Sequence, residues 1–207
     1  MKIGMIFECG PSGADKKVYE YLAKQLDSDI VIVSSTLGSK PTLVEQCGTE
    51  AKALLEIGNC ERVIITWDLY PPWQGRRQRP CRFNDRTLIK DSLRKAGLTE
   101  WQLQRVHLVC IEKELETFLL ADKGAIEVYL SGIKRHPCRI GGLRNPERHR
   151  NPKARLSQIF QEHIGRRYND LVDAEKIIKL ADVDRIWRCS SFERFADKVA
   201  GVRRHVL

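Results

Sequence analysis

Several features that would assign a chain to a specialised class are scarce or missing in this sequence. No apolar run approaches the roughly 20 residues that a membrane-spanning helix needs. The seven cysteines are scattered singly, without a C-x-x-C pair or the spacing of a zinc finger. The opening residues, MKIGMIFECG, have no long apolar region before a small-residue cleavage site, so they predict a first strand rather than a signal peptide. We therefore expect a cytoplasmic protein with reduced cysteines and no membrane partner.

Nucleotide-binding motifs are missing as well. The sequence contains no Gly-Lys-Ser/Thr phosphate-binding motif, and no G-x-G-x-x-G follows the first predicted strand. These absences make a dinucleotide-binding enzyme an unfavoured third interpretation. Any ATPase activity connected with this protein would have to come from a partner chain.

Acidic residues are fewer than basic ones: 27 Asp and Glu against 36 Lys and Arg give a formal net charge of +9. A basic protein favours anionic partners such as nucleic acid. The excess is concentrated in residues 133–155 and in the run from Arg76 to Arg82. We expect largely sequence-independent phosphate contacts from Arg76, Arg77, Arg79, Arg144, Arg148 and Arg150. A solvated surface, or a dock for an acidic partner protein, is the other interpretation of these runs.

The pattern of apolar residues predicts an α/β fold. In residues 1–130, short β-branched runs alternate with longer amphipathic stretches, as in β-α units around a mostly parallel sheet. Strands are predicted near residues 2–8, 29–34, 62–68 and 105–111, with helices near 14–26, 43–57, 84–97 and 114–130. Residues 131–207 are predicted to form a basic loop and a helical appendage packed on this domain, with helices near 154–164, 173–181 and 191–202.

Acidic residues follow three of the predicted strands directly. Glu8 follows the first strand, Asp68 ends the third, and Glu112, Glu114 and Glu116 follow the fourth. Ligands of open α/β sheets collect at the carboxyl ends of the strands, so these carboxylates are expected to converge on one crevice. Converging carboxylates that stay open to substrate suit Mg²⁺ or Mn²⁺, which bridge to phosphate oxygens. The pattern therefore favours phosphoryl chemistry.

Two details of this acidic set stay open at the level of sequence. Asp15 lies in the first turn of a predicted helix, where it serves either the helix dipole or the same crevice. Within the last cluster, a helix that begins near residue 113 would place Glu112 and Glu116 about one turn apart and direct Glu114 elsewhere. A solvated acidic helix start is the alternative interpretation of this cluster. Asp122 is expected to be a surface or capping residue.

The acidic set resembles the Toprim domain of topoisomerases, primases and overcoming-lysogenization-defect nucleases. The resemblance is sharper to a group of uncharacterised bacterial Toprim-like proteins. It is carried by Glu8-Cys9-Gly10, by Ile64-Ile65-Thr66-Trp67-Asp68, by the stretch from Glu114 to Asp122 (ELETFLLAD), and by Cys189–Phe195 (CSSFERF). It implies a Toprim-like, Rossmann-like fold and a nuclease with Mg²⁺ or Mn²⁺, and the related nucleases suggest a role in phage defence. It also favours Glu114 and Glu116 over Glu112.

The sequence departs from the Toprim pattern at one important position. Where a full motif has Asp-x-Asp, this chain has Asp68-Leu69-Tyr70, and a phenol with a pKa of about 10 does not replace a carboxylate at neutral pH. Two functions therefore remain. In the first, Glu8, Asp68 and Glu116 are the catalytic metal ligands of a nuclease, with Glu112 and Glu114 as further candidate ligands. In the second, the chain is an inactive Toprim-like module that binds nucleic acid or docks on an ATPase partner.

Overall fold

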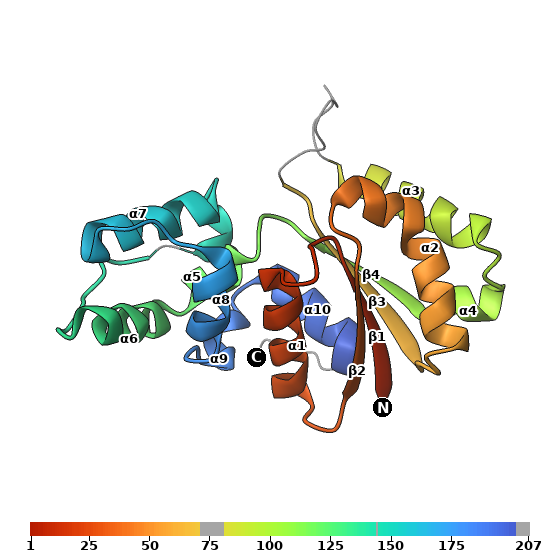
Figure 1. Ribbon diagram of the computed structural model, residues 1–207, viewed down its shortest axis with the longest axis horizontal. Coiled ribbons are helices and arrows are strands. Elements are labelled where there is room, and N and C mark those ends of the chain that lie inside the picture. The colour runs from red at the N-terminus through yellow and green to blue at the C-terminus, as the bar shows by residue number, and fades with distance from the viewer. Residues whose placement is uncertain (71–80, 144, 202–207) are drawn as a thin grey trace.

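The computed structural model describes residues 1–70, 81–143 and 145–201. Its centre is a four-stranded sheet of parallel strands in the order β2-β1-β3-β4 (Figure 1). The strands are β1 (Lys2–Phe7), β2 (Val31–Thr36), β3 (Arg62–Asp68) and β4 (Val106–Ile111). The prediction of an α/β fold with a mostly parallel, Rossmann-like sheet is thereby confirmed.

Helices cover both faces of this sheet. On one face lie α2 (Lys40–Glu56), α3 (Arg82–Lys95) and the short α4 (Glu100–Gln104), and on the other lie α1 (Ala14–Leu26) and α10 (Ser190–Ala200) (Figure 1). Each face has its own apolar cluster, the first around Trp67 and the second around Phe7 and Tyr19. Because the two central strands are buried on both faces, their sequences are almost continuously apolar instead of alternating.

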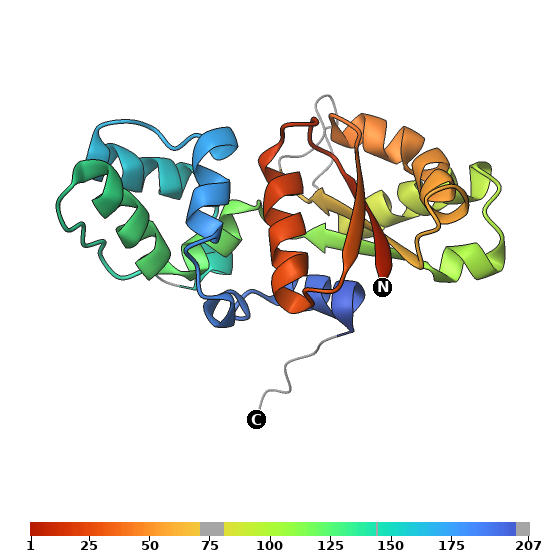
Figure 2. The ribbon, with the colours of Figure 1, turned by 60° about the horizontal axis from the view of Figure 1, so that its bottom comes forward.

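The remaining helices form a lobe beside α1 (Figures 1 and 2). It consists of α5 (Glu116–Ala121), α6 (Lys123–Lys134), the 3₁₀ turn η1 (Pro146–Arg148), α7 (Pro152–Ile164), α8 (Asp170–Ile178) and α9 (Val183–Ile186). The apolar cluster of the sheet continues into this lobe, and α6 crosses the predicted boundary between residues 130 and 131. No helix within the described ranges is both long and apolar enough to cross a membrane.

The chain returns to the sheet at its C-terminal end. The ring of Phe195 on α10 lies 5.3 Å from that of Tyr19 on α1, measured between centroids. Arg62 of β3 donates a hydrogen bond of 3.2 Å to the carbonyl oxygen of Lys198. The predicted C-terminal helices are therefore present and are packed against the α/β core.

The single helix predicted for residues 114–130 is wrong, because the chain forms two helices, α5 and α6, which are separated by a break at Asp122. The Asp122 carboxylate accepts a hydrogen bond of 2.9 Å from the backbone N–H of Gly124 and caps α6. It also accepts from the N–H of Asp182 and from Arg185, which lie on the α8–α9 connection and on α9. A capping role for Asp122 was one of its two predicted roles, and the structure confirms it.

Helices α2 and α3 approach each other closely at Gly48. A Cβ atom at this position would overlap the backbone carbonyl of Ser92 on α3. Because Gly48 has no side chain, its backbone N–H comes close enough to donate a hydrogen bond of 3.2 Å to the Ser92 hydroxyl. This contact fixes α3, and with it Arg82 and Asp85 at the start of α3, relative to the sheet.

Candidate functional site

Glu8 and Asp68 lie close together at the carboxyl edge of the sheet. Strands β1 and β3 are direct neighbours, with Phe7 opposite Thr66, so the two acids leave adjacent strands in the same direction. The backbone amide of Asp68 interacts with the Glu8 carboxylate. Both residues line a narrow pocket that has no room for a water molecule in this structure and whose wall also contains Asp15, Tyr19, Thr66, Trp67 and Ile111. The structure thus brings Glu8 and Asp68 together, and their role as metal ligands stays a prediction.

The turn between β1 and α1 delivers a third carboxylate to this pocket. It is closed by a hydrogen bond of 2.8 Å from the N–H of Gly13 to the carbonyl of Gly10, and α1 begins directly afterwards. Asp15, in the first turn of α1, is therefore part of the pocket wall as well as of the helix start. Burial and the neighbouring charge of Asp170 raise the pKa of Asp15 to about 6, although Lys153 opposes this shift.

A fourth carboxylate, that of Glu116, comes from the helical lobe. Glu116 is the first residue of α5 and is only 3% exposed. Burial raises its pKa to about 7, with Lys153 acting in the opposite direction and with Glu114 and Asp15 adding to the increase. Because α5 begins at Glu116 and not near residue 113, the prediction that Glu112 and Glu116 share one helical face is wrong.

Burial also dominates the ionisation of Glu8 and Asp68. It raises the pKa of Glu8 to about 7, with Lys40 lowering it and the charge of Asp15 raising it further. The pKa of Asp68 is raised well above its usual range by burial and by the charges of Asp15, Glu8 and Glu116. The charge of Asp15 therefore raises the pKa of each of the other three acids, and Glu8 and Glu116 add to the increase at Asp68. We call Glu8, Asp15, Asp68 and Glu116 the acidic cluster.

Two lysines partly balance the acidic cluster, and neither was identified from the sequence. Lys40, the first residue of α2, is buried; its Nζ lies 3.6 Å from an Asp85 carboxylate oxygen and donates a hydrogen bond of 3.2 Å to the carbonyl of Leu69. Asp85 in turn accepts a hydrogen bond from Trp67. Lys153 of α7 donates a 2.7 Å hydrogen bond to Asp170. Lys153 belongs to the basic run of residues 133–155, but nothing in the sequence placed either lysine beside these acids.

Glu114 lies near the acidic cluster but is not part of it. Its carboxylate accepts a hydrogen bond of 3.1 Å from the backbone N–H of Lys153, so it serves the N-terminus of α7. Its charge still contributes to raising the pKa of Asp68 and of Glu116. Glu114 is therefore near the acidic cluster but already has a structural partner.

Two buried polar atoms around the acidic cluster lack a hydrogen-bond partner in the described part of the chain. They are Glu8 Oε2 and the Tyr19 hydroxyl, while the Tyr168 hydroxyl lies within reach of the Glu116 carboxylate. Burial and neighbouring carboxylates, which include Glu116 for both tyrosines, raise the pKa of the two phenols. Buried polar groups are paired in most native structures, so unpaired groups gathered around acids indicate a site for water, an ion or a ligand.

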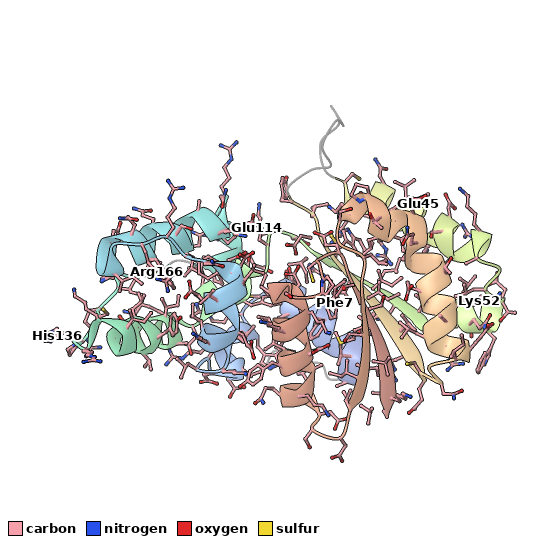
Figure 3. The ribbon with its side chains drawn as sticks, in the orientation of Figure 1. Phe7, Glu45, Lys52, Glu114, His136 and Arg166 are labelled. Carbon is pink, nitrogen blue, oxygen red and sulfur yellow. The ribbon has the colours of Figure 1, made fainter. Side chains whose placement is uncertain are left out.

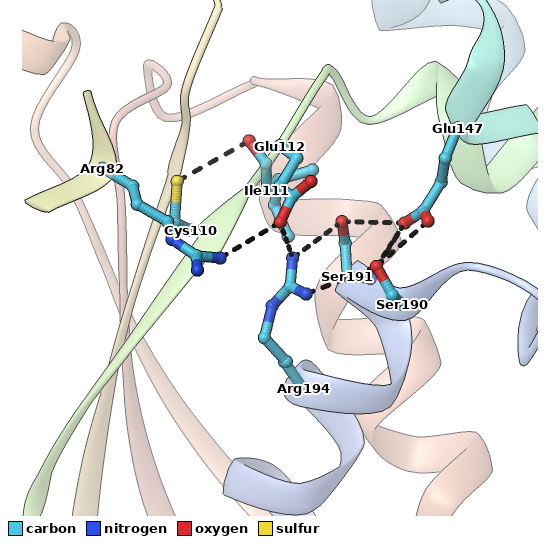
Figure 4. A network of polar contacts seen from close by, with 8 residues as sticks. All are labelled: Arg82, Cys110, Ile111, Glu112, Glu147, Ser190, Ser191 and Arg194. Atoms are coloured by element: carbon cyan, nitrogen blue, oxygen red, sulfur yellow. Dashed lines mark hydrogen bonds and ion pairs between the residues drawn. The ribbon is translucent and has the colours of Figure 1, made fainter. Parts of the chain in front are cut away.

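The Glu112 side chain lies outside the acidic cluster, beside Arg82 and Arg194 (Figure 4). Its carboxylate accepts hydrogen bonds of 3.1 Å each from Arg82 at the start of α3 and from Arg194 of α10. Arg194 also contacts the Ser191 hydroxyl, and Ser191 donates to Glu147 of η1 through both its backbone N–H and its hydroxyl. The structure thus does not bring Glu112 into the acidic cluster but uses it to connect α3, β4 and α10.

The other predicted residues are placed as follows. Tyr70, at the position of the second Toprim acid, is 40% exposed, and the Lys113 ammonium lies 5.1 Å from the centre of its ring. Arg148 and Arg150 are exposed, as a role in binding phosphates requires. The remaining residues predicted to contact nucleic acid lie outside the described residues: Arg76, Arg77, Arg79 and Arg144.

The acidic cluster fits Mg²⁺ or Mn²⁺ in its donor chemistry. Its donors are carboxylate oxygens, which hard divalent cations prefer, and Glu8 Oε2 is a buried oxygen without a partner. Within the described ranges, however, no three His, Cys, Asp or Glu side chains already form a group that could hold a metal ion. Binding of a cation would therefore require adjustment of these side chains.

Fold and site together define an α/β protein with a pocket of partly compensated carboxylates at the carboxyl edge of a parallel sheet. The chain belongs to the family described as "Domain of unknown function (DUF4276)", whose model matches residues 12–200. This match includes Asp15, Asp68 and Glu116 and begins after Glu8. No curated protein and no solved structure matches the chain. The resemblance to Toprim proteins accordingly stays a prediction.

Proposed function

We propose that this protein is a metal-dependent nuclease of the Toprim type, which cleaves phosphodiester bonds of nucleic acid with Mg²⁺ or Mn²⁺. The observation that carries the proposal is the acidic cluster. Glu8, Asp15 and Asp68 line one buried pocket, the charge of Glu116 acts on Asp68, and burial raises the pKa of all four carboxyl groups. Like charges that are gathered without full compensation are costly for the fold, and perturbed pKa values of this kind are concentrated at functional sites.

The residues of the pocket have distinct roles in this proposal. Glu8, Asp68 and Glu116 would hold the cation, and Asp15 shares the pocket wall with Glu8 and Asp68. The bound cation would neutralise charge at the scissile phosphate and lower the pKa of a bound water. Lys40, which acts on Glu8, and Lys153, which acts on Glu116, stabilise part of the negative charge in the free protein. Arg148 and Arg150 offer exposed positive charge for the nucleic acid backbone.

Cleavage assays with single-stranded and double-stranded DNA and RNA test this function directly. In the presence of Mg²⁺ or Mn²⁺, Glu8→Gln, Asp68→Asn and Glu116→Gln should each lower the rate at least about a hundredfold, because a metal ligand contributes several kcal/mol and each ~1.4 kcal/mol is a factor of ten. Glu112→Gln is the matched control and should retain activity, since Glu112 is bound by two arginines outside the cluster. A chelator should abolish the wild-type activity. Equal activity of wild type and Glu8→Gln would reject the mechanism.

The second candidate function is a catalytically inactive module that binds nucleic acid or docks on an ATPase partner. Tyr70 favours it, because this residue occupies the position of the second Toprim acid and packs against Lys113. In this case the wild type shows no metal-dependent cleavage in any of the four substrate assays. The substitution Tyr70→Asp, which restores the acid, is then the informative gain-of-function variant.

A further inference from the structure

The outer edge of β4 forms a second surface, separate from the acidic cluster. β4 is the last strand in the order β2-β1-β3-β4, and within the described ranges no strand pairs with its outer side (Figure 1). The carbonyl of Arg105 accepts a hydrogen bond from Val63 of β3, and that of Ile111 accepts one from Leu69, directly after β3. Because successive residues of a strand direct their N–H and C=O groups to opposite sides, those of Val106, Leu108 and Cys110 point outward. This edge therefore offers donors and acceptors at every second residue.

A groove with a volume of about 430 Å³ runs along this edge. Its floor includes Val106 and Leu108 of β4, and its walls come from α3, from α4 and from Lys198 of α10. The groove lies along the first half of β4, whereas the acidic cluster lies beyond the end of that strand at the carboxyl edge. It is therefore a separate site, and its floor combines apolar side chains with free backbone groups.

The walls of the groove are strongly basic. Arg86, Lys90 and Arg94 line it from α3, opposite Lys198, with Glu100 as the acidic member of the lining. Arg94 is paired with Asp91 at 3.1 Å, and Lys198 with Asp197 at 2.8 Å. Arg86 and Lys90 are exposed and have no ion-pair partner among the described residues. Arg86 and Lys90 thus place two positive charges without an ion-pair partner in the described structure beside the unpaired edge of β4.

We propose that this groove binds an acidic, extended peptide segment of a partner protein, which adds a fifth strand to the sheet at the β4 edge. Main-chain hydrogen bonds to an exposed edge give affinity in such complexes, and pockets for alternate side chains give specificity. Glutamate or aspartate side chains of the segment would meet Arg86 and Lys90, while its apolar side chains would contact Leu108. Outward N–H and C=O groups in alternation match a polypeptide, whereas a nucleic acid would use the cations alone.

A fluorescein-labelled peptide in which glutamate alternates with valine is the probe, and fluorescence anisotropy with the full chain is the assay. The double charge reversal Arg86→Glu/Lys90→Glu should weaken binding at least about tenfold, since two charge-assisted contacts are lost. Its matched control is Lys176→Glu/Arg188→Glu, which makes the same change in net charge at exposed positions outside the groove and should bind as the wild type does.

A second pair of variants tests the backbone pairing itself. Leu108→Pro removes an outward N–H, which an edge strand tolerates, and Leu108→Ala makes a similar loss of side-chain packing but keeps that N–H. Circular dichroism checks that both variants fold. If the proposal is right, Leu108→Pro binds the peptide about tenfold more weakly than Leu108→Ala. Equal binding by these two variants overturns strand addition.

Two further results would also overturn the proposal. One is that the wild type fails to bind the acidic peptide. The other is that a labelled single-stranded oligonucleotide, and not the peptide, depends on Arg86 and Lys90, because the groove would then be a track for nucleic acid. Neither result bears on the cleavage assays of the acidic cluster, so the two functions are tested separately.

Discussion

The substitution Glu116→Gln should stabilise the protein at neutral pH and leave its stability unchanged in acid. Glu116 is 3% exposed, and burial raises its pKa from 4.5 to about 7. The folded state therefore binds a proton more tightly than the unfolded state, so the stability that the protonated carboxyl contributes is fully present below about pH 4.5 and is lost as the pH rises through about 7. Each pKa unit corresponds to about 1.4 kcal/mol, which sets an upper limit of about 3 kcal/mol for this side chain.

Glutamine keeps the volume of the side chain and cannot ionise. In chelator, we expect the free energy of unfolding of Glu116→Gln to exceed that of the wild type by about 2 kcal/mol at pH 8, below the limit because Lys153 remains nearby. At pH 4.5 the two proteins should differ little. Urea unfolding at both pH values, with linear extrapolation to water, measures this difference. The exposed Glu45→Gln on α2 is the control (Figure 3). A loss of stability in Glu116→Gln that is the same at both pH values would refute the reasoning.

Three further outcomes follow from other contacts. Tyr19→Phe removes a buried hydroxyl that lacks a partner among the described residues, so the free energy of unfolding in urea should rise by about 1 kcal/mol. If that hydroxyl serves the site, the variant should also cleave more slowly. Gly48→Ala should cost about 1–3 kcal/mol because its Cβ would overlap the α3 backbone. In contrast, Gly132→Ala on α6, where a Cβ meets nothing within 4 Å, should not destabilise. Charge reversal at Arg148 and Arg150 should weaken nucleic acid binding for all sequences tested and reduce its salt dependence, and an unchanged salt slope in filter binding would exclude these contacts.

The sheet was predictable because each strand is a short apolar run that ends at a polar residue. The run Arg62–Asp68 is buried at its five central residues and was predicted with the bounds that the structure shows. The mostly parallel arrangement followed from helix-length segments between the strands. These signals are local, so they can be recognised in the sequence without knowing the tertiary structure.

The acidic cluster was only partly predictable, because its completion depends on contacts between distant segments. The rule for strand ends predicted Glu8 and Asp68. Asp15 remained ambiguous since a helix start explains an acid equally well. Lys153 reaches the cluster only because the helical lobe packs beside α1, and its backbone N–H then holds Glu114, 39 residues earlier in the chain. No periodicity in the sequence encodes that packing.

Glu112 shows how a local rule fails when the assumed helix boundary is wrong. The expectation that it faces Glu116 required a helix from about residue 113, but the chain first makes a turn in which the N–H of Thr117 bonds to the carbonyl of Glu114. This turn leaves Glu112 beside β4, within reach of Arg82 and Arg194. The arginines come from the start of α3 and from α10, so a long-range ion-pair network replaced the predicted helical face.

The energetic balance of the acidic cluster connects its stability to its function. A pocket that served the fold alone would gain from replacing these acids by neutral or apolar residues, because burial of several like charges without full compensation opposes folding. The chain instead keeps four of them, with Glu8 Oε2 and the Tyr19 hydroxyl unpaired in the described structure. A bound divalent cation would remove this cost, because each carboxylate would then be attracted to the cation as well as repelled by its neighbours. The same cation would make phosphodiester cleavage feasible, so the stability cost of the free protein and the proposed nuclease activity have one physical origin.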